Sequence, residues 1–190
     1  MRAAAILAGG ESRRFGADKV MADVAGQPMV ARVAALLGGD TLAVVGHAEA
    51  AVLLNAADLR DPADAMRGPL AGVLAALNWA ESMGAAWLLT APCDTPLLPP
   101  DLYPRLIAAA EAANAAAAHA RTDDGVHALC AVWRPALAVR LRASFAQGVH
   151  PPVRELAPDA VHVHFADGAA FLNVNTPDDL ARAAARIGGG

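Results

Sequence analysis

The stretch Ile6-Leu-Ala-Gly-Gly-Glu-Ser-Arg-Arg-Phe-Gly-Ala-Asp-Lys19 decides the fold of this chain. It joins an apolar run, residues 3–7, to a loop with two consecutive glycines and three cationic side chains. Glycine has no Cβ and tolerates positive φ, so backbone N–H groups in such a loop can approach an anion closely. The pattern predicts a first strand that ends in a phosphate-binding loop, in an α/β domain.

Two well-known phosphate loops do not fit this stretch. The dinucleotide fingerprint requires G-x-G-x-x-G, whereas five residues separate Gly10 from Gly16 here. A Walker A loop requires Gly-Lys-Ser/Thr, and Gly16 is followed by Ala-Asp-Lys. The alternative interpretation is a strand-to-helix turn in which the glycines relieve strain and the arginines face water.

The composition limits the classes of ligand. The chain has 190 residues, which is typical of one domain. Its formal net charge is −4, so no global basic field favours nucleic acid or an anionic membrane. Arginines gathered at one loop of an acidic protein indicate a small anionic ligand rather than a polymer.

The cysteines and the N-terminus indicate a cytoplasmic protein. Cys93 and Cys130 are isolated and lack C-x-x-C spacing, so we expect neither a disulfide nor a zinc site, in a reducing compartment. The first residues do not resemble a signal peptide. No uninterrupted apolar run approaches the ~18 residues that span a bilayer.

Strand and helix patterns alternate along most of the chain. Periodicity predicts strands over 3–7, 41–45, 86–90, 115–119, 126–133, 161–165 and 171–174, with helices over 28–37, 48–55, 69–83 and 135–147. The stretch 97–114 contains Pro-Pro-Asp followed by a long, alanine-rich predicted helix. Residues 121–125 between two of these strands are typical of a hairpin turn. An antiparallel pair within a strand–helix alternation predicts a three-layer α/β fold with a mainly parallel, mixed sheet.

Three polar features follow predicted strands or begin helices. Asp94 comes just after a buried strand, where open α/β sheets bind ligands, although capping of the next turn explains it equally well. Gly68 precedes Pro69 at a helix start that can face a ligand loop. Gly46 and His47 follow the second strand, and we interpret His47 as a solvated loop histidine.

The last polar stretch is Asn173-Val-Asn-Thr-Pro-Asp-Asp-Leu180. Thr176 is a typical N-cap, and the following proline and two aspartates suit a first helical turn. This account leaves Asn173 and Asn175 unexplained. Turn and cap bonding is as good an explanation for them as a ligand contact.

Four blocks then occur in a diagnostic order: Leu7-Ala-Gly-Gly10…Arg14-Phe-Gly…Asp18-Lys19, Gly68-Pro-Leu-Ala-Gly72, Pro92-Cys-Asp-Thr-Pro96 and Asn173-Val-Asn-Thr-Pro177. With them the sequence resembles the molybdenum cofactor guanylyltransferase family, the MobA proteins, among the Rossmann-like nucleotidyltransferases. The resemblance covers nearly the whole chain. It implies one domain over 1–190, with a nucleotide half at about 1–100 and an acceptor-substrate half at about 101–190.

The resemblance implies transfer of GMP from Mg-GTP to the terminal phosphate of molybdopterin, with release of pyrophosphate. Lys19 would contact the phosphates, and Asp94 would hold magnesium and nucleotide. Arg14, with Arg13, would offset charge on the pyrophosphate. The residues implied to contact the nucleotide or the acceptor are Leu7, Ala8, Gly9, Gly10, Asp61, Gly68, Asn173 and Asn175, with Arg154 for the acceptor phosphate.

Other functions stay open on the sequence alone. They are a cytidylyl- or sugar-phosphate nucleotidyltransferase, and a non-catalytic nucleotide-binding carrier of molybdopterin; molybdopterin-handling proteins are possible partners. The double glycine of the first loop favours the guanylyl enzyme. One departure from the family is the second strand end, where an asparagine often contacts nucleotide and this chain has Val45-Gly46-His47. Either Gly46 or His47 can align there.

Overall fold

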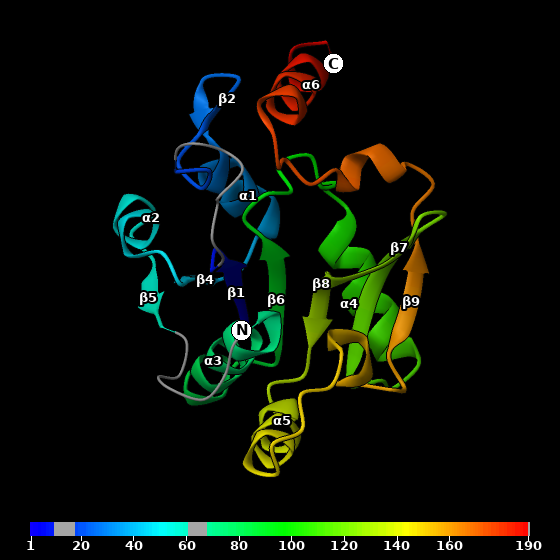
Figure 1. Ribbon diagram of the computed structural model, residues 1–190. Coiled ribbons are helices and arrows are strands. Elements are labelled where there is room, and N and C mark those ends of the chain that lie inside the picture. Colours follow the sequence, from blue (N-terminus) through cyan, green and yellow to red (C-terminus); the bar gives the residue numbers. More distant parts are fainter. Residues whose placement is uncertain (10–17, 61–67, 190) are drawn as a thin grey trace.

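The computed structural model describes residues 1–9, 18–60 and 68–189, and these form a twisted sheet between two layers of helices (Figure 1). The strand order of the main sheet is β5-β4-β1-β6-β8-β7-β9. Its strands are β1 (Arg2–Leu7), β4 (Thr41–Val45), β5 (Ala57–Leu59), β6 (Trp87–Pro92), β7 (Ala117–Thr122), β8 (Gly125–Trp133) and β9 (Val161–His164). A separate two-stranded hairpin consists of β2 (Asp23–Val24) and β3 (Gln27–Pro28).

The helices alternate with these strands. They are α1 (Met29–Leu37), α2 (Ala48–Leu53), α3 (Pro69–Ser82), α4 (Leu102–Ala112), α5 (Leu137–Ala146) and α6 (Pro177–Gly188), with short 3-10 turns η1 (Val153–Glu155) and η2 (Gly168–Phe171). In the part of the chain that the structure describes, no helix combines the length and apolar composition needed to cross a bilayer.

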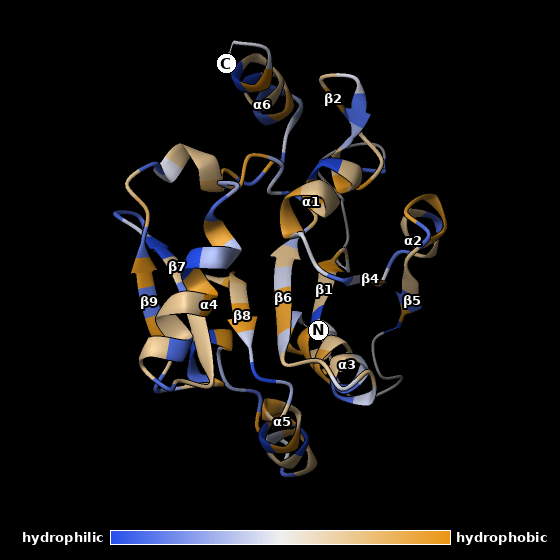
Figure 2. Cartoon of the chain, turned by 180° about the vertical axis from the view of Figure 1, so that it is seen from behind, coloured by the Kyte–Doolittle hydropathy of each residue, from blue (hydrophilic) through white to orange (hydrophobic). Residues whose placement is uncertain are grey.

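Successive residues of the central strand β1 belong to different cores, because side chains alternate between the faces of a sheet. Ala4 and Ile6 pack in the core that contains residues of α1, α2 and α4. Ala3 and Ala5 pack in the core that contains residues of α3 and α5. The apolar colouring of β1, β6 and β8 in Figure 2 fits strands that are covered on both faces.

A third, smaller core joins the end of the chain to its beginning. Val24 and Met29, from β2 and the start of α1, pack with Val174 and Ala183. The C-terminal helix α6 therefore lies beside the β2–β3 hairpin, as the upper part of Figure 1 shows. This packing brings the Asn-Val-Asn segment toward the chain that follows Lys19.

The direction of the strands identifies the edge at which sheets of this class bind ligands. β1 is parallel to both of its neighbours, β4 and β6, whereas β8 is antiparallel to β6 and β7. The chain leaves β1 toward β4 on one side and later enters β6 on the other, so the strand order reverses between β1 and β6. Ligands of open α/β sheets bind outside the carboxyl ends of strands at such a reversal.

The expected mixed, mainly parallel α/β sheet is confirmed, but several elements differ from the predictions. The strand predicted over Phe171–Val174 is wrong: Phe171 ends η2, and Val174 donates its N–H to a loop carbonyl, that of Asp94, instead of to a strand. The alanine-rich helix predicted after Pro-Pro-Asp is confirmed as α4, which begins at Leu102, just past two consecutive prolines that lack N–H donors. The strand β5 and the β2–β3 hairpin were not predicted.

Candidate active site

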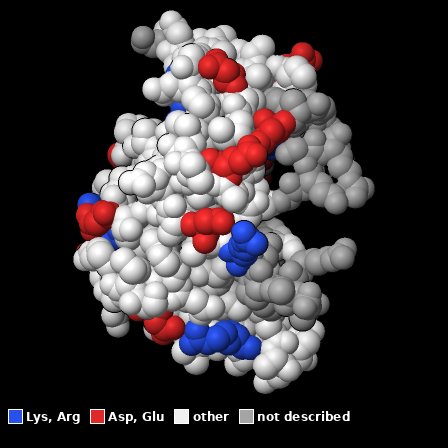
Figure 3. All heavy atoms as spheres, turned by 90° about the vertical axis from the view of Figure 1, so that its left-hand side faces the viewer, with Lys and Arg blue, Asp and Glu red and all other residues white. Residues whose placement is uncertain are grey.

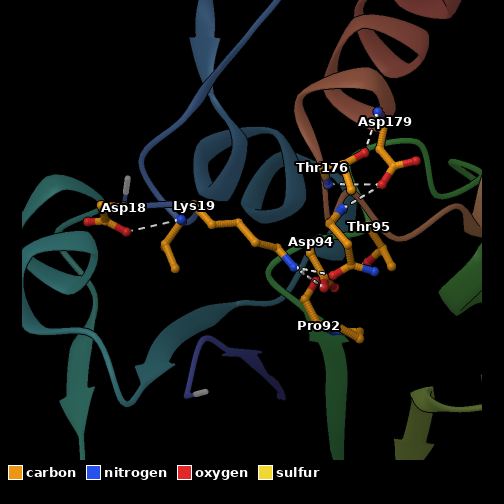
Figure 4. Close-up of polar contacts among 9 residues, drawn as sticks. Asp18, Lys19, Pro92, Asp94, Thr95, Thr176 and Asp179 are labelled. Atoms are coloured by element: carbon orange, nitrogen blue, oxygen red, sulfur yellow. Dashed lines mark hydrogen bonds and ion pairs between the residues drawn. The ribbon is translucent and has the colours of Figure 1, made fainter. Parts of the chain in front are cut away.

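Three side chains from distant parts of the sequence meet at the carboxyl edge of the sheet. Lys19 Nζ donates hydrogen bonds to Asp94 Oδ2 and to Asn175 Oδ1, each at 2.7 Å. Figure 4 shows the extended Lys19 side chain crossing to the carboxylate at the end of β6. We call Lys19, Asp94 and Asn175 the lysine cluster.

Asp94 is fixed by the loop that follows β6. Cys93 donates its N–H to Leu7 O (3.0 Å), which extends the β1–β6 pairing by one step. Thr95 Oγ1 donates to Pro92 O (3.0 Å), which closes the turn around Asp94. The Asp94 side chain therefore serves the lysine cluster and does not cap this turn.

Lys19 lies in a short turn that its neighbours hold. Asp18 Oδ1 accepts the Val20 N–H (3.1 Å), and Lys19 O accepts the Ala22 N–H (3.2 Å). The Lys19 and Asp94 side chains are only 12% and 18% exposed. Partial burial lowers the local dielectric, so this ion pair is stronger than one on an open surface.

Asn175 is held by the cap of α6. The Asp179 carboxylate accepts the backbone N–H groups of both Asn175 (3.0 Å) and Thr176 (2.9 Å), and Thr176 Oγ1 accepts the Asp179 N–H (3.1 Å). The Asn175 N–H and the Arg182 guanidinium beside Asp179 lower the pKa of this carboxyl from 3.8 to about 2. The predicted cap at Thr176 is confirmed, and its acidic partner also positions Asn175.

The end of β1 lies between the two strands that flank it. Leu7 pairs with Val45 on one side and with Pro92 on the other. Gly46 follows β4 with φ +82°, and a Cβ on it would stand 2.9 Å from Gly9 Cα. The backbone at Gly9 therefore reaches the same edge as the lysine cluster, in close contact with the end of β4.

The site contains a cysteine that is unsuited to covalent catalysis. Cys93 precedes Asp94 and is buried, and burial together with the nearby Asp94 charge raises the pKa of its thiol from 9.0 to about 12. A thiol is nucleophilic only when deprotonated. The arrangement therefore suits electrostatic binding and positioning of an anionic substrate. Among the described residues of the lysine cluster, Lys19 supplies the positive charge.

Magnesium fits this donor set as a metal shared with a substrate. Mg²⁺ in phosphoryl-transfer sites is bound by one or two carboxylates, with phosphates and water completing its shell. Asp94 supplies one carboxylate at the edge, and among the described residues only Lys19 donates a hydrogen bond to it. The described part of the chain has no group of three His, Cys, Asp or Glu side chains that could hold a metal alone.

Gly10, Arg13, Arg14 and Asp61 are outside the described residues. Gly68 is the N-cap of α3 with φ +112°, and its described hydrogen bond, from Ala71 N, does not involve the lysine cluster.

Of the residues predicted to contact the acceptor, the structure brings only some to the lysine cluster. Asn173 lies on the segment that leads to Asn175, and its side chain is exposed. Arg154 is not brought to this edge. It lies in η1, whose neighbours Val153 and Leu156 pack in the core around Trp133, beside the first residues of β6.

His47 differs from what its sequence context predicted. It is a loop residue directly before α2, as predicted, but it is not freely solvated: its side chain is 18% exposed and both ring nitrogens have partners. Nε2 lies 2.9 Å from Asp18 Oδ2, and Nδ1 accepts the Ala50 N–H (3.1 Å) as the N-cap of α2. Its position directly before a helical pattern could have predicted the helix cap. The contact with Asp18 could not be predicted, because the two residues are 29 positions apart in sequence.

Elsewhere on the surface of the described residues, we find no cluster of polar side chains as well ordered by hydrogen bonds as the lysine cluster. On the face that Figure 3 shows, acidic and basic side chains are interspersed among many uncharged ones. A hollow of about 350 Å³ lies between the start of α4, η2 and α6. Its arginines, Arg105 and Arg186, are already paired with Asp101 and Asp167.

Comparison with known proteins agrees with this geometry. A family model described as "MobA-like NTP transferase domain" matches residues 4–167. A relative from Cereibacter sphaeroides, named molybdenum cofactor guanylyltransferase, is 44% identical over 94% of this chain and 93% of its own length. A relative of the same name from Rhodobacter capsulatus is 39% identical over 96% of this chain and 94% of its own.

A solved structure supports the same relationship. The crystal structure of molybdopterin-guanine dinucleotide biosynthesis protein A from Archaeoglobus fulgidus superimposes with a TM-score of 0.76 at 25% identity, and the alignment covers 100% of both chains. The family match, the two relatives and this structure each extend over most or all of the sheet that carries the lysine cluster. The chain belongs to the MobA-like NTP transferase family.

Proposed function

We propose that this protein is a molybdenum cofactor guanylyltransferase, which transfers GMP from GTP to molybdopterin and releases pyrophosphate. Its membership of the MobA-like family and the names of its relatives support this activity. The observation that carries the proposal is the pairing of Lys19 with Asp94 at the carboxyl ends of β1 and β6. A cation and a carboxylate at that edge are the groups that a metal-bound triphosphate requires.

Nucleotidyl transfer depends on positioning and charge neutralisation more than on a covalent catalyst. In this proposal the backbone of Leu7, Ala8 and Gly9 lies against the nucleotide. The Lys19 ammonium turns from Asp94 toward the phosphate oxygens and offsets the charge that develops on the departing pyrophosphate. The attacking group is an ionised phosphate of the acceptor, so no general base is needed.

Asp94 is the proposed magnesium ligand. Bound there with the triphosphate, the metal would neutralise phosphate charge and polarise the phosphorus under attack. Asn175 would then keep Lys19 in place. Its amide oxygen can still accept a hydrogen bond from the Lys19 ammonium when the Asp94 carboxylate binds the metal. The cap contacts from Asp179 keep Asn175 in place for this role.

The proposal assigns the remaining predicted residues by substrate. The nucleotide half, about 1–100, includes Gly10, Arg14, Asp61 and Gly68. The acceptor half, about 101–190, includes Asn173 and Asn175, whose amides would hydrogen-bond the pterin. The packing of α6 on the β2–β3 hairpin supports this division, since it brings the acceptor segment to the nucleotide edge.

A pyrophosphate-release assay tests the function. The protein is incubated with molybdopterin, magnesium and either GTP, CTP or ATP, and the dinucleotide product is identified by mass spectrometry. We expect release with GTP at least about tenfold faster than with CTP or ATP. Equal or faster release with CTP would replace the guanylyl assignment by a cytidylyl one, and nucleotide binding without release would favour a carrier.

The variant Asp94→Asn separates a metal role from a structural one. It keeps the size of the side chain and removes the charge, so we expect an intact fold and a loss of roughly 10²-fold or more in kcat/KM. Asp101→Asn is the matched control, because Asp101 is exposed and lies before α4. Full activity of a folded Asp94→Asn protein would contradict the metal assignment.

A further inference from the structure

We propose that His47 is a positioning residue for nucleotidyl transfer, which holds Asp18 and thereby fixes the backbone that carries Lys19. This inference rests on the proposed function of the lysine cluster and adds a residue to it. The His47 and Asp18 side chains lie 29 positions apart in sequence and meet at 2.9 Å. The contact joins the start of α2 to the turn from which the Lys19 side chain extends.

The hydrogen bonds of His47 define its tautomer. Nδ1 accepts the backbone N–H of Ala50 at 3.1 Å, so this nitrogen carries a lone pair and no proton. A neutral imidazole then has its proton on Nε2, which donates to Asp18 Oδ2. The helix cap thus orients the ring, and the ring presents its single donor to Asp18.

Asp18 passes this constraint to Lys19. Its second oxygen, Oδ1, accepts the Val20 N–H at 3.1 Å. This hydrogen bond links the residue before Lys19 to the residue after it. Lys19 O in turn accepts the Ala22 N–H. The Asp18 carboxylate and the Ala22 N–H therefore fix the backbone around Lys19. The Asp18 carboxylate is itself bound to His47 at the start of α2.

The position of His47 itself is well determined. Gly46 donates its N–H to Leu59 O at 2.8 Å and packs directly on Gly9, which places the following residue at the ligand edge. Both ring nitrogens of His47 are occupied by protein partners. The histidine consequently acts on the substrate through Asp18 and Lys19 rather than by direct contact.

Such positioning matters because a misplacement of about 1 Å can cost up to 10²-fold in rate. Lys19 reaches Asp94 and Asn175 with a long, flexible side chain, so the origin of that side chain decides where the ammonium can stand. Asp18 is 42% exposed, and water competes for its oxygens when His47 is removed. We therefore expect a moderate effect on activity.

The variant His47→Asn separates the helix cap from the contact with Asp18. Asparagine is among the best N-cap residues, and its amide oxygen can accept the Ala50 N–H as Nδ1 does. Its shorter side chain has no atom at the position of Nε2, so it cannot reach Asp18. His47→Ala removes both interactions, and Asp18→Asn leaves one carbonyl oxygen for two donors.

The test combines steady-state kinetics with amide hydrogen exchange. We expect His47→Asn to lower kcat/KM for GTP about tenfold, mainly through kcat, with an unchanged unfolding midpoint. The double variant with Asp18→Asn should be no slower than the slower single variant, because the two residues act as one unit. In the free protein the Val20 amide should exchange several-fold faster in His47→Asn, while the Ala50 amide stays protected.

The outcomes distinguish this inference from the proposed function. Wild-type kcat/KM and Val20 exchange in His47→Asn would overturn the positioning role. A loss in His47→Ala that His47→Asn fully restores would show that only the cap matters, which also overturns it. Absence of pyrophosphate release by the wild-type protein contradicts the proposed function, and the exchange measurement still tests the His47–Asp18 contact.

Discussion

Lys19 Nζ and Asp94 Oδ2 are 2.7 Å apart, although the two residues are 75 positions apart in sequence. The pair joins the loop after β1 to the loop after β6, across the point where the strand order of the sheet reverses. Asn175 completes the contact from the far end of the chain. Three segments thus converge on one ammonium group.

Replacement of Lys19 is expected to abolish most activity without unfolding the protein. Lys19→Ala should lower kcat/KM for GTP by roughly 10²- to 10³-fold, because the cation that offsets phosphate charge is lost. Lys19→Arg should recover only part of it, since a planar guanidinium does not fit a site built for an ammonium. Arg140→Ala, on the exposed face of α5, is the control; equal activity of Lys19→Ala and this control would contradict the role.

Loss of the Asp179 carboxylate should disturb the lysine cluster from a distance. Asp179→Asn loses one acceptor oxygen and the charge that hold Asn175 and Thr176, so we expect a lower unfolding midpoint and a lower kcat/KM. The neighbouring variant Asp178→Asn keeps the cap and serves as the control. A normal activity in Asp179→Asn would show that Asn175 does not need this support.

The same residue predicts a pH dependence of stability. The pKa of Asp179 is lowered to about 2 in the folded protein, from 3.8. The folded state therefore favours the ionised carboxylate, and its stabilising contribution is complete above pH 3.8 and lost as the pH falls toward 2. The difference in unfolding midpoint between wild type and Asp179→Asn should shrink across that interval, and a constant difference would argue against this linkage.

Gly46 and Gly26 provide a matched pair of substitutions. Their φ angles are +82° and +83°, so alanine at either position costs about 1 kcal/mol of backbone strain. A Cβ on Gly26 meets nothing within 4 Å, whereas a Cβ on Gly46 would stand 2.9 Å from Gly9 Cα. Urea unfolding should show Gly46→Ala to be at least about 1 kcal/mol less stable than Gly26→Ala. GTP binding should weaken only in Gly46→Ala, and equal effects of the two variants would refute the close contact.

His119 should make the protein sensitive to mild acid. The ring is fully buried, Nδ1 donates to Ala128 O at 3.1 Å, and Nε2 has no hydrogen-bond partner among the described residues. Burial lowers the pKa of this histidine from 6.5 to about 4. The unfolded chain binds the proton more readily, so the free energy of unfolding should decrease as the pH falls from 6.5 toward 4, by on the order of 3 kcal/mol at most.

Urea unfolding at about pH 7.5 and about pH 5, on either side of the ordinary histidine pKa, tests this linkage. His119→Phe removes the titrating group and should lose less stability than wild type between the two pH values. His150→Gln replaces an exposed histidine and should keep the wild-type difference. An unchanged difference in His119→Phe would assign the acid sensitivity to another group.

The fold was largely predictable because its signals are local. Apolar runs such as Ala3–Leu7 and the periodicity of α1 and α3 predict elements that the structure confirms. The errors occur where local signals are weak or ambiguous. The two-residue strands β2 and β3 are too short for a periodic pattern, and the apolar residues of Phe171–Val174 fit a strand as well as they fit a buried loop.

In the candidate site too, the features that depend on local sequence were predictable and the long-range contacts were not. The sequence by itself determined that a first strand ends before Gly9, that Asp94 follows a buried strand, and that Thr176 caps the last helix, because each depends on residues within one turn or one strand. Only the tertiary structure decided that Lys19 pairs with Asp94 and Asn175, and that His47 contacts Asp18. Those contacts depend on strand order and on the packing of α6 against the β2–β3 hairpin, which no local pattern encodes.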